Sequence, residues 1–518
     1  MVTLFNRPKP TVLIIMDGVG VAPPGPGNAV TLAKTPFLDK YWPSYPHTYL
    51  KAAGLDVGLP EGTDGNSEVG HMNIGAGKIV YQELPRIDMA IEDKSFFKNP
   101  VILNGIKQMK ALNTNFHIIG LVGGGKVHSS LAHLLTLIKL LSEQDIDRDR
   151  VFLHLFTDGR DSPPKSCLEY IQQVDMQCKI KSVGRIASLC GRYYAMDRDQ
   201  RWDRTQKAYE MLTKGKGKKV QNWEEAVELS YREGITDEYI EPCVVTTEHK
   251  PIGSVEKGDV ILFCNFRGDR AIQLTQAFID KNFKNFEREP IEDIYFIGMT
   301  EYAVDYPEHV AFPEEVISNP LGRVLSDNGL TQLRIAESEK FMHVTHFFNC
   351  KSNLLYPGED NIEVPSPKDV STYDQKPEMN APLLTDILVD KIYSNEYDFI
   401  LVNFANPDMV AHTGVLDAAI KAMETTDQCI GRIIPKILDR NGAVIITADH
   451  GNIEELIESK TGGIDTKHST NPVPLIVVKG GEVPRELTVG ILADIAPTIL
   501  AIMGIEKPVN MIGRNLLI

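Results

Sequence analysis

Short apolar runs recur along the whole chain, and a polar loop that contains glycine follows each of them. Runs of this length that are rich in valine, isoleucine and phenylalanine are typical of strands buried on both faces of a sheet. A single run could equally belong to a buried helix, but the repetition favours strands for the set. The runs occupy residues 11–16, 116–122, 151–156, 260–266, 397–404, 443–448 and 474–480.

Longer segments with helical periodicity separate these runs, among them residues 129–144, 381–394 and 416–440. Alternating strands and helices are typical of parallel sheets that carry helices on both faces. We therefore expect an α/β protein built on a doubly wound sheet.

Reactive side chains follow most of the predicted strands. Parallel sheets of this kind bind ligands at the carboxyl ends of their strands. One polar residue in such a loop means little, but the repeated coincidence suggests that several loops converge on sites. The residues concerned are Asp17, His128, Asp158, Arg160, Asp161, Arg267, Arg270, Asp408, Asp449 and His450.

Composition excludes several classes of protein. The chain has 54 lysine and arginine residues against 70 aspartate and glutamate residues, a formal net charge of −16. This balance argues against a protein that coats nucleic acid. The seven cysteines lack CxxC spacing, and the first apolar run is too short for a signal or membrane segment. We expect a cytoplasmic protein that acts on a small molecule, without a membrane or nucleic-acid partner.

Three segments near the C-terminus carry residue types that bind metals. Asp408 and His412 are four residues apart, so both side chains would lie on one face of a helix. Asp449 and His450 leave a predicted strand together, and His468 lies in a loop shortly before a proline. Mixed carboxylate and imidazole ligands suit Mn²⁺, Zn²⁺ or Fe. Each segment alone is better explained by ordinary hydrogen bonds, but their joint occurrence favours a metal site.

Ser67 lies between Gly65 and Gly70 at the start of a predicted helix. A serine in this position is most often a helix N-cap. The alternative is a nucleophile at a helix N-terminus, where a phosphate would find free N–H groups and a favourable dipole. A metal would lower the pKa of the hydroxyl, and Asp17 adds an oxygen ligand. A serine nucleophile beside a two-metal site is therefore chemically coherent.

Other motif searches point to no further chemistry. No GxGxxG follows a predicted strand and no GxxxxGK[ST] is present, so nucleotide binding is not indicated. His343 and His346 lie in a strand-like run. We expect both to be packed or hydrogen-bonded rather than bound to a metal.

A series of long motifs spans residues 17–474, which is essentially the whole chain. In order they are GNSEVGHMNIGAG, DGRDSPP, GRYYAMDRDQRWDR, FCNFRGDRAIQ, ESEKFMHVTHFF, NPDMVAHTG, ITADHGN and KHSTNPVP. As a set they resemble the cofactor-independent phosphoglycerate mutases of the alkaline phosphatase superfamily. The resemblance implies interconversion of 3-phosphoglycerate and 2-phosphoglycerate in glycolysis and gluconeogenesis through a phosphoserine. It implies no requirement for 2,3-bisphosphoglycerate.

The resemblance also implies which residues carry the reaction. Ser67 would become the phosphoserine, and two divalent ions, expected to be manganese, would assist it. One metal would be bound by Asp17, Ser67, Asp449 and His450, and the other by Asp408, His412 and His468. The substrate would be bound by His128, Arg160, Asp161, Arg192, Arg198, Arg267, Arg270 and Lys340, with Asp161 also a candidate acid or base.

The expected ligands define the domain organisation. They lie near both ends of the chain, so the ends must fold together for a common site to exist. We expect residues 1–80 and 317–518 to form a metal-binding, alkaline-phosphatase-like domain. Residues 81–316 would form an inserted substrate-binding domain, with hinges within 81–90 and 312–322. We expect a monomer in which closure excludes water from the phosphoserine.

Two rival functions stay open at this point. The first is a related metal-dependent phosphatase or phosphomutase, which could act on another phosphate ester with the same metal ligands. The second is a non-catalytic scaffold descended from an enzyme, which is disfavoured because the serine and the full ligand set are intact.

One segment also has an alternative interpretation. The arginine-rich segment 185–204 could be a surface salt-bridge network instead of a binding site.

Overall fold

Two parts of the chain fold separately in the computed structural model, which describes residues 7–303, 306–458, 461–480 and 487–517. Residues 1–82 and 316–518 form unit 1, and residues 83–315 form unit 2. The chain therefore leaves unit 1 after Gln82 and returns at Val316. Most of the first expected hinge is helical, because residues from Glu83 onward belong to α4 (Glu83–Glu92).

Unit 1 is built on a sheet whose central strands are parallel. The order is β13-β12-β14-β1-β15-β16-β2-β17. The neighbours β14, β1 and β15 run parallel, whereas β16 is antiparallel to β15. The bounds are β1 Thr11–Met16, β2 His47–Lys51, β12 Gln332–Glu337, β13 Glu359–Val364, β14 Phe399–Phe404, β15 Ala443–Thr447, β16 Val473–Lys479 and β17 Gly490–Ile491.

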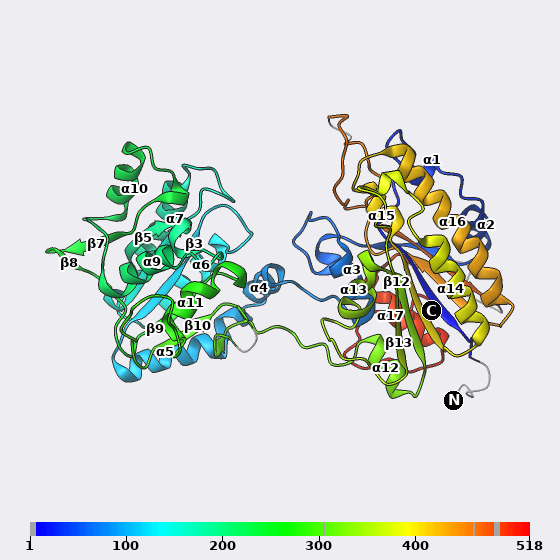
Figure 1. Cartoon of the computed structure of the whole chain (residues 1–518). Coiled ribbons are helices and arrows are strands. Elements are labelled where there is room, and N and C mark those ends of the chain that lie inside the picture. The colour runs from blue at the N-terminus through cyan, green and yellow to red at the C-terminus, as the bar shows by residue number, and fades with distance from the viewer. Residues whose placement is uncertain (1–6, 304–305, 459–460, 481–486, 518) are drawn as a thin grey trace. The chain divides into compact units, whose positions relative to one another are not determined.

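Helices cover both faces of this sheet, which explains why every residue of β1 and β14 is buried. Helices α1, α2, α14 and α16 lie on one face, and α3, α12, α13 and α17 lie on the other (Figure 1). Their bounds are α1 Ala29–Leu32, α2 Pro36–Ser44, α3 Ser67–Ala76, α12 Leu321–Asp327, α13 Ser338–Met342, α14 Ala381–Ser394, α16 Leu416–Leu438 and α17 Ile495–Ile502. The short α15 (Asn406–Ala411) precedes α16.

Unit 2 repeats this plan on its own sheet, in the order β11-β10-β9-β3-β4-β5-β7-β6, with β8 paired to β7. The strands from β11 to β5 are parallel. Their bounds are β3 Phe116–Val122, β4 Val151–Thr157, β5 Arg185–Gly191, β6 Lys218–Val220, β7 Cys243–Thr247, β8 Lys250–Pro251, β9 Val260–Phe263, β10 Tyr295–Gly298 and β11 His309–Val310.

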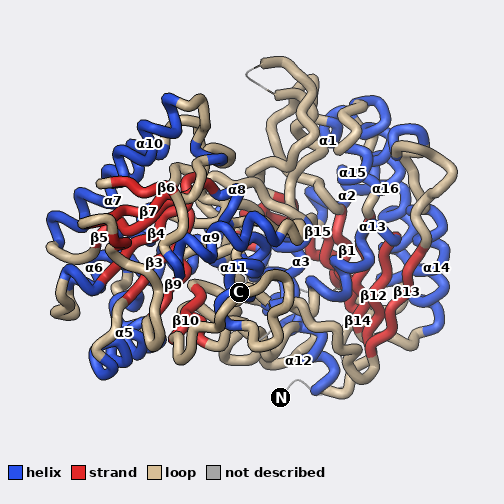
Figure 2. The backbone as a smooth tube through the Cα atoms, turned by 60° about the vertical axis from the view of Figure 1, so that its left-hand side comes forward, coloured by secondary structure: helices blue, strands red, loops and turns tan. Residues whose placement is uncertain are grey.

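The helices of unit 2 flank its sheet as those of unit 1 do (Figure 2). Besides α4 they are α5 Pro100–Leu112, α6 Leu131–Ser142, α7 Cys167–Lys181, α8 Arg192–Ala195, α9 Trp202–Lys214, α10 Trp223–Arg232 and α11 Ile272–Ile279. The expected α/β class with doubly wound sheets is therefore confirmed for the chain.

Two expectations about local structure are wrong. The last predicted strand, residues 474–480, does form as β16, but it is antiparallel to its neighbour instead of parallel. The run that contains His343 and His346 is a π-helical turn, His343–Phe347, directly after α13. This turn packs on α3 and the sheet. A short apolar run can be buried either as a strand or as a helical turn, so the pattern alone does not distinguish the two.

Cysteine and membrane expectations can be compared with the fold. All seven cysteines are free, and six of them are buried. Among the helices that the structure describes, none is both long enough and apolar enough to cross a membrane.

Candidate functional site

Three adjacent strands of unit 1 bring acidic side chains to one edge of the sheet. Asp17 comes directly after β1, Asp408 follows β14 within α15, and Asp449 follows β15. Because β14, β1 and β15 are parallel neighbours, their carboxyl ends lie side by side. All three aspartates are buried.

Ser67 is the first residue of α3, and its hydroxyl is not the helix cap. The Asn66 side chain caps α3 by accepting a hydrogen bond from the Val69 N–H at 2.9 Å. The Ser67 hydroxyl is therefore available to the aspartate cluster. Its Oγ lies 2.9 Å from His450 Nε2 and 3.3 Å from Asp17 Oδ1.

A close backbone contact holds α3 against this edge of the sheet. A Cβ added to Gly70 would lie 2.4 Å from the Asp449 carbonyl oxygen, so only glycine fits there. Ser67 lies one helical turn before Gly70. The contact therefore sets the distance between Ser67 and the residues that follow β15.

A second group of possible ligands surrounds Asp408. His412 Nε2 lies 3.4 Å from Asp408 Oδ1, and His468 Nε2 lies 3.5 Å from the same atom. The two imidazole Nε2 atoms are 3.2 Å apart. Backbone carbonyls orient both rings, because His412 Nδ1 bonds Thr466 O and His468 Nδ1 bonds Gly65 O.

The donor set fits divalent cations. Three groups have ligand atoms that lie within 4.8 Å of one another: Asp408, His412 and His468; Asp17, Asp408 and His450; and Asp17, His71 and Asp449. Buried carboxylates in this number need compensating positive charge. Carboxylate and imidazole donors together suit Mn²⁺ or Zn²⁺.

Lys340 supplies part of this charge from α13. Its Nζ donates to Ser67 Oγ at 2.8 Å and to Asp408 Oδ2 at 2.6 Å, and it lies 2.7 Å from Asp17 Oδ1. Burial opposes the charged form, but Asp17, Asp408 and Asp449 outweigh it and raise the pKa of Lys340. The structure thus places this expected substrate-binding residue among the expected metal ligands.

The aspartates also stabilise a protonated His450. Burial acts to lower the pKa of His450, but the charges of Asp449, Asp408 and Asp17 raise it to about 10. For Asp449 burial acts in the opposite direction, and the neighbouring His450 and His71 hold its pKa well below the usual range. In the metal-free protein, His450 therefore carries a proton at neutral pH.

Two buried residues that sequence reasoning missed orient the ligands. Asn403, within β14, donates to Asp17 Oδ2 at 2.7 Å, and its Nδ2 also lies 3.1 Å from His71 Nε2. His71 Nδ1 lies 2.8 Å from Ser67 O and 3.2 Å from Asp449 Oδ2. His71 stands in the GNSEVGH motif, four residues after Ser67 on α3, and this i, i+4 spacing is the signal that could have found it.

The predicted substrate residues of unit 2 gather around another buried ion pair. Arg192 is 3% exposed, and its Nη1 lies 2.6 Å from both Asp158 Oδ1 and Asp161 Oδ2. Burial raises the pKa of Asp161, but the hydrogen bond and charge of Arg192 outweigh it and lower the pKa. Asp158 also accepts from Ser162 Oγ at 2.7 Å, which holds the loop after β4. Asp158 thus positions Arg192, a role we did not assign from sequence.

Asp269 joins the remaining basic residues to this cluster. Arg198 Nη1 lies 2.8 Å from Asp269 Oδ2, and Arg267 Nε lies 3.4 Å from its Oδ1. His128 Nδ1 is 3.5 Å from Asp269 Oδ1, and its Nε2 is 4.0 Å from Asp161 Oδ2. Burial and Arg192 lower the pKa of His128 to about 4, so the ring is neutral at pH 7.

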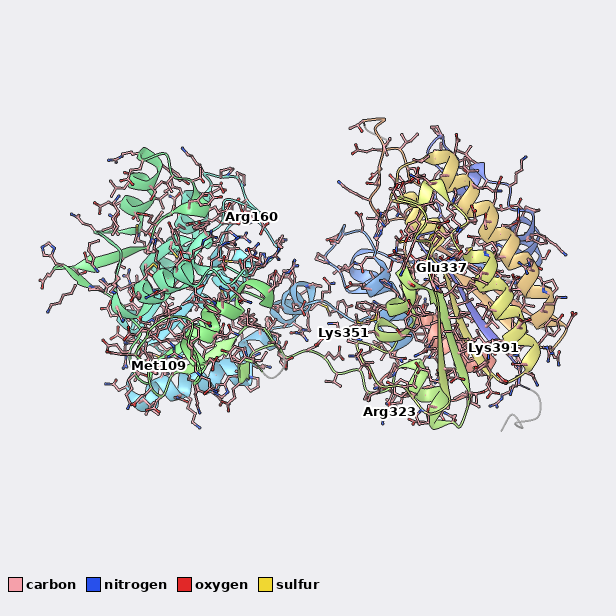
Figure 3. All side chains as sticks on the ribbon, viewed as in Figure 1. Met109, Arg160, Arg323, Glu337, Lys351 and Lys391 are labelled. Atoms are coloured by element: carbon pink, nitrogen blue, oxygen red, sulfur yellow. The ribbon has the colours of Figure 1, made fainter. Side chains whose placement is uncertain are left out.

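Arg270 and Arg160 complete the basic cluster. Arg270 Nη1 donates to Met196 O at 3.1 Å. Burial lowers the pKa of Arg270, and the nearby charges of Arg192, Arg198 and Arg160 lower it further. Arg160 is about half exposed and lies 3.6 Å from Glu238 (Figure 3). Several guanidinium groups thus crowd one place, as expected of an anion site.

The rival interpretation of segment 185–204 holds for part of it. Arg185 pairs with Asp149, and Arg201 and Arg204 pair with Asp197. Arg185 thus forms a surface ion pair, and Arg201 and Arg204 pair with the buried carboxylate of Asp197, whereas Arg192 and Arg198 face the cluster described above. The segment therefore combines both arrangements.

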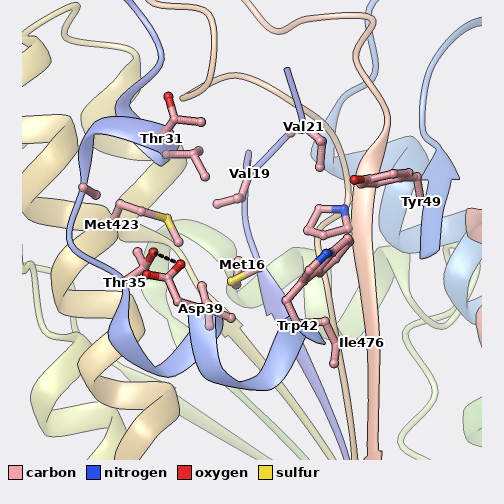
Figure 4. Close-up of a pocket in the computed structure, with 15 residues that line it drawn as sticks. Met16, Val19, Val21, Thr31, Thr35, Asp39, Trp42, Tyr49, Met423 and Ile476 are labelled. Carbon is pink, nitrogen blue, oxygen red and sulfur yellow. Dashed lines mark hydrogen bonds between the residues drawn. The ribbon is translucent and has the colours of Figure 1, made fainter. Parts of the chain in front are cut away.

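A separate cavity lies beside the carboxyl end of β1 and is lined by residues of α1, α2, α16 and β16. It has a volume of about 410 Å³, and Met16, Trp42 and Met423 face into it (Figure 4). Gly20 forms part of its wall, but none of the predicted site residues does. Asp39 is the only charged residue of the lining. The cavity is thus distinct from the cluster of candidate ligands.

Family comparisons match both units. The family model described as the BPG-independent PGAM N-terminus matches residues 87–304, and the Sulfatase model matches residues 271–505. A 2,3-bisphosphoglycerate-independent phosphoglycerate mutase of Moorella thermoacetica is 48% identical over 511 residues, 98% of each chain. One from Methanosarcina acetivorans is 50% identical over 512 residues, 98% of this chain and 99% of the relative.

A solved structure also matches over nearly the full length. The crystal structure of Leishmania mexicana phosphoglycerate mutase at low cobalt concentration is 29% identical to this chain. It matches with a TM-score of 0.57 and covers 98% of both chains. The Sulfatase match and this structure agree with the expected alkaline-phosphatase-like fold.

Proposed function

Because the chain belongs to the 2,3-bisphosphoglycerate-independent phosphoglycerate mutases, we propose that it interconverts 3-phosphoglycerate and 2-phosphoglycerate through a phosphoserine on Ser67. The observation that carries this proposal is the surroundings of Ser67 Oγ. This atom lies within 3.3 Å of Asp17, His450 and Lys340, at the N-terminus of a helix. The reaction places the enzyme in glycolysis and gluconeogenesis, in the cytoplasm.

Two divalent ions are part of the proposal, with manganese as the preferred species. Asp17, Ser67, Asp449 and His450 would hold one ion, and Asp408, His412 and His468 would hold the other. Bound ions would lower the pKa of the Ser67 hydroxyl and neutralise charge on the phosphoryl oxygens. The structures of the relative from Leishmania mexicana were determined at low cobalt concentration, and Co²⁺ belongs to the same first-row divalent series as Mn²⁺.

Ser67 and Lys340 prepare the phosphoryl transfer. Ser67 Oγ attacks phosphorus, and the bond from phosphorus to the glycerate oxygen breaks. The proton that Ser67 releases is then available to the leaving oxygen. Lys340, which donates to Ser67 Oγ, holds the hydroxyl and adds positive charge where the phosphoryl group would lie. The free N–H groups at the start of α3 favour the same anion.

The basic cluster of unit 2 would hold the glycerate part. Arg160, Arg192, Arg198, Arg267 and Arg270 suit a substrate that carries a carboxylate and a phosphate, because guanidinium groups bind both in a bidentate manner. Retention of glycerate allows its other hydroxyl to attack the phosphoserine. The bond from phosphorus to Ser67 Oγ then breaks, and the proton of the attacking hydroxyl ends on Ser67 Oγ, which regenerates the serine. Neutral His128 can hydrogen-bond either hydroxyl.

Asp161 is the proposed base for the attacking glycerate hydroxyl. Its low pKa keeps it ionised at neutral pH, so it can accept the proton of that hydroxyl. The contact with Arg192 Nη1 at 2.6 Å fixes its orientation. We further propose that the enzyme works as a monomer.

The decisive assay measures conversion of 3-phosphoglycerate without added 2,3-bisphosphoglycerate. We expect conversion that disappears on chelation and returns with Mn²⁺. Ser67→Ala should lower turnover at least about a thousandfold while metals still bind, because the nucleophile is lost and most ligands stay. The exposed Ser44→Ala serves as the control and should match wild type. Substantial turnover by Ser67→Ala would contradict the nucleophile assignment.

The same assay separates the mutase from a related phosphatase. A phosphatase would release inorganic phosphate and glycerate instead of 2-phosphoglycerate. Comparing 3-phosphoglycerate with a pentose phosphate and a generic phosphate ester decides between the two. Dominant hydrolysis of the generic ester would favour the alternative of another phosphate-ester enzyme.

A further inference from the structure

Glu454 lies inside unit 1 beside the candidate metal ligands, but outside the groups that they form. Glu454 is buried, with only 2% of its surface exposed. Oε2 accepts from the backbone N–H groups of Gly20 and Asn452, each at 2.9 Å. Oε1 accepts from Ser469 Oγ and, at 3.0 Å, from Asn471 Nδ2. These four donors occupy both oxygens, so Glu454 has no lone pair left for a metal.

The four donors come from three segments that carry candidate ligands. We call these segments the ligand loops: residues 17–21, 449–454 and 466–472. Gly20 lies three residues after Asp17, Asn452 lies two residues after His450, and Ser469 is next to His468. One carboxylate therefore ties together loops that are up to about 450 residues apart in sequence.

The backbone leaves room for this carboxylate at two glycines. A Cβ on Gly20 would lie 2.3 Å from the carboxyl carbon of Glu454. A Cβ on Gly451 would lie 2.4 Å from Glu454 Oε1. No larger residue fits at either position without displacing the carboxylate, so backbone and acid are matched to each other.

Further bonds extend this arrangement to the remaining ligand segment. Asn452 donates its backbone N–H to Glu454, and its side-chain Nδ2 donates to Asp408 Oδ1 at 2.7 Å. The loops also bond one another directly, since Ser469 N donates to Gly451 O at 2.9 Å and Val21 N to Pro472 O at 2.8 Å. Both expected metal sites thus connect to the loops that Glu454 joins.

We propose that Glu454 is a positioning residue that sets the spacing of the ligand loops and thereby the affinity for both metals. This inference rests on the proposed function, because it takes the clustered aspartates and histidines as ligands. Glu454 acts only through the loops and touches no reacting atom. Groups that orient metal ligands in this way typically contribute a factor of about 10 to 100 in metal affinity.

The test compares Glu454→Gln with its neighbour Glu455→Gln. Glutamine keeps the size of the side chain but has a single oxygen, so its amide nitrogen must face at least one donor of the original four. Glu455→Gln removes the same charge one residue away, where the carboxylate has one bond, to Asn471 Nδ2 at 3.0 Å. Metal affinity is measured by titrating Mn²⁺ into each metal-free, full-length protein.

We expect Glu454→Gln to bind Mn²⁺ about 10 to 100 times more weakly than wild type. Glu455→Gln should bind as wild type does. At saturating Mn²⁺, Glu454→Gln should recover the wild-type KM for 3-phosphoglycerate and most of kcat, which a merely misfolded variant would not do. Unchanged Mn²⁺ affinity in Glu454→Gln overturns the proposal, even when the variant is less stable.

Two further measurements keep the outcomes distinct. Wild type that binds no Mn²⁺ would refute the proposed metal sites, whereas wild-type binding with an unaffected Glu454→Gln refutes only the role of Glu454. If Glu454→Gln does not fold, Ser469→Ala replaces it, because that change removes a single donor. Ser469→Ala must then weaken Mn²⁺ binding in the same direction, and equal affinity would overturn the proposal.

Discussion

At the residue scale, the function of Ser67 depends on which neighbour caps α3. Sequence alone left Ser67 as either an N-cap or a nucleophile. Asn66 takes the capping role, because its side chain accepts from the Val69 N–H. The Ser67 hydroxyl is then directed at Asp17, His450 and Lys340. If α3 began one residue later, Ser67 would itself be the N-cap, and its hydroxyl would bond the helix backbone instead of the aspartate cluster.

Metal binding should compete with protons at His450. The aspartates raise the pKa of His450 to about 10 in the metal-free protein, so a metal must displace that proton at neutral pH. The apparent Mn²⁺ affinity should therefore rise about tenfold from pH 7 to pH 8 and fall on acidification. Titrations at the two pH values, with proton release followed in buffers of different ionisation enthalpy, check this. Equal affinities at both would contradict it.

Glu337 should make unit 1 less stable as the pH rises. Burial is the main cause that raises the pKa of this carboxyl at the end of β12 to about 7 (Figure 3). Its stabilising contribution is thus complete below pH 4.5 and is lost as the pH passes 7. Glu337→Gln should gain up to about 3 kcal/mol over wild type at pH 8 and nothing near pH 4.5.

Unfolding of metal-free Glu337→Gln and wild type at several pH values measures this difference. The exposed Glu363→Gln on the neighbouring β13 is the matched control, and its stability should change little with pH relative to wild type. A difference between Glu337→Gln and wild type that is constant from pH 4.5 to pH 8 would rule out the titration of Glu337.

At the scale of elements, the site depends on how α3 packs against the end of β15. Gly70 and Gly75 of α3 both pack closely against the backbone of other elements. An added Cβ would lie 2.4 Å from Asp449 O at Gly70 and 1.9 Å from Phe348 O at Gly75. The helix therefore approaches the sheet edge on one side and the π-helical turn on the other. Its position cannot shift without moving Ser67.

Gly70→Ala should push α3 away from Asp449. Alanine normally favours a helix over glycine by about 1 kcal/mol, but here the added methyl group has no space. Displacement of Ser67 by about 1 Å should lower kcat on the order of a hundredfold. Gly25→Ala is the control, because the nearest atom to an added Cβ there is 3.9 Å away. Wild-type kcat in a folded Gly70→Ala would show that α3 can be displaced without effect.

At the scale of the whole molecule, the two units differ in how the chain builds them. Unit 2 is one continuous segment with its own sheet and its own buried cores. A buried chain of contacts, Asp259–His117–His154–Ser188, links side chains from its strand region at 3.0, 3.0 and 2.8 Å. Unit 1 needs both ends of the chain, because β1 from the first segment lies between β14 and β15 of the second.

The fragment 83–315 should therefore fold alone, whereas 316–518 should not. The first contains every strand of its sheet, but the second lacks β1 and β2, so the edges of β14 and β15 that pair with β1 would have no partner strand. Circular dichroism and thermal unfolding of both fragments test this. A non-cooperative 83–315, or a cooperative 316–518, would contradict the expectation.

Sequence by itself determined the elements and the chemistry. The apolar runs at 11–16 and 116–122 became β1 and β3 with the same bounds, and 381–394 became α14. These patterns are local, because a strand that is buried on both faces needs a run of consecutive apolar residues, and such a run is visible in the sequence. The ligand types were also visible, because carboxylates and imidazoles after strands are local features as well.

Only the tertiary structure decided how these residues meet. The antiparallel pairing of β16, the contacts of Asn403 and His71 with Asp17 and Asp449, and the loop bonds of Glu454 all join residues whose relation depends on sheet order. Strand order and close backbone approach arise from packing between distant segments, and no periodicity within one segment encodes them. Local pattern therefore predicts which groups can react, and packing decides which of them are brought together.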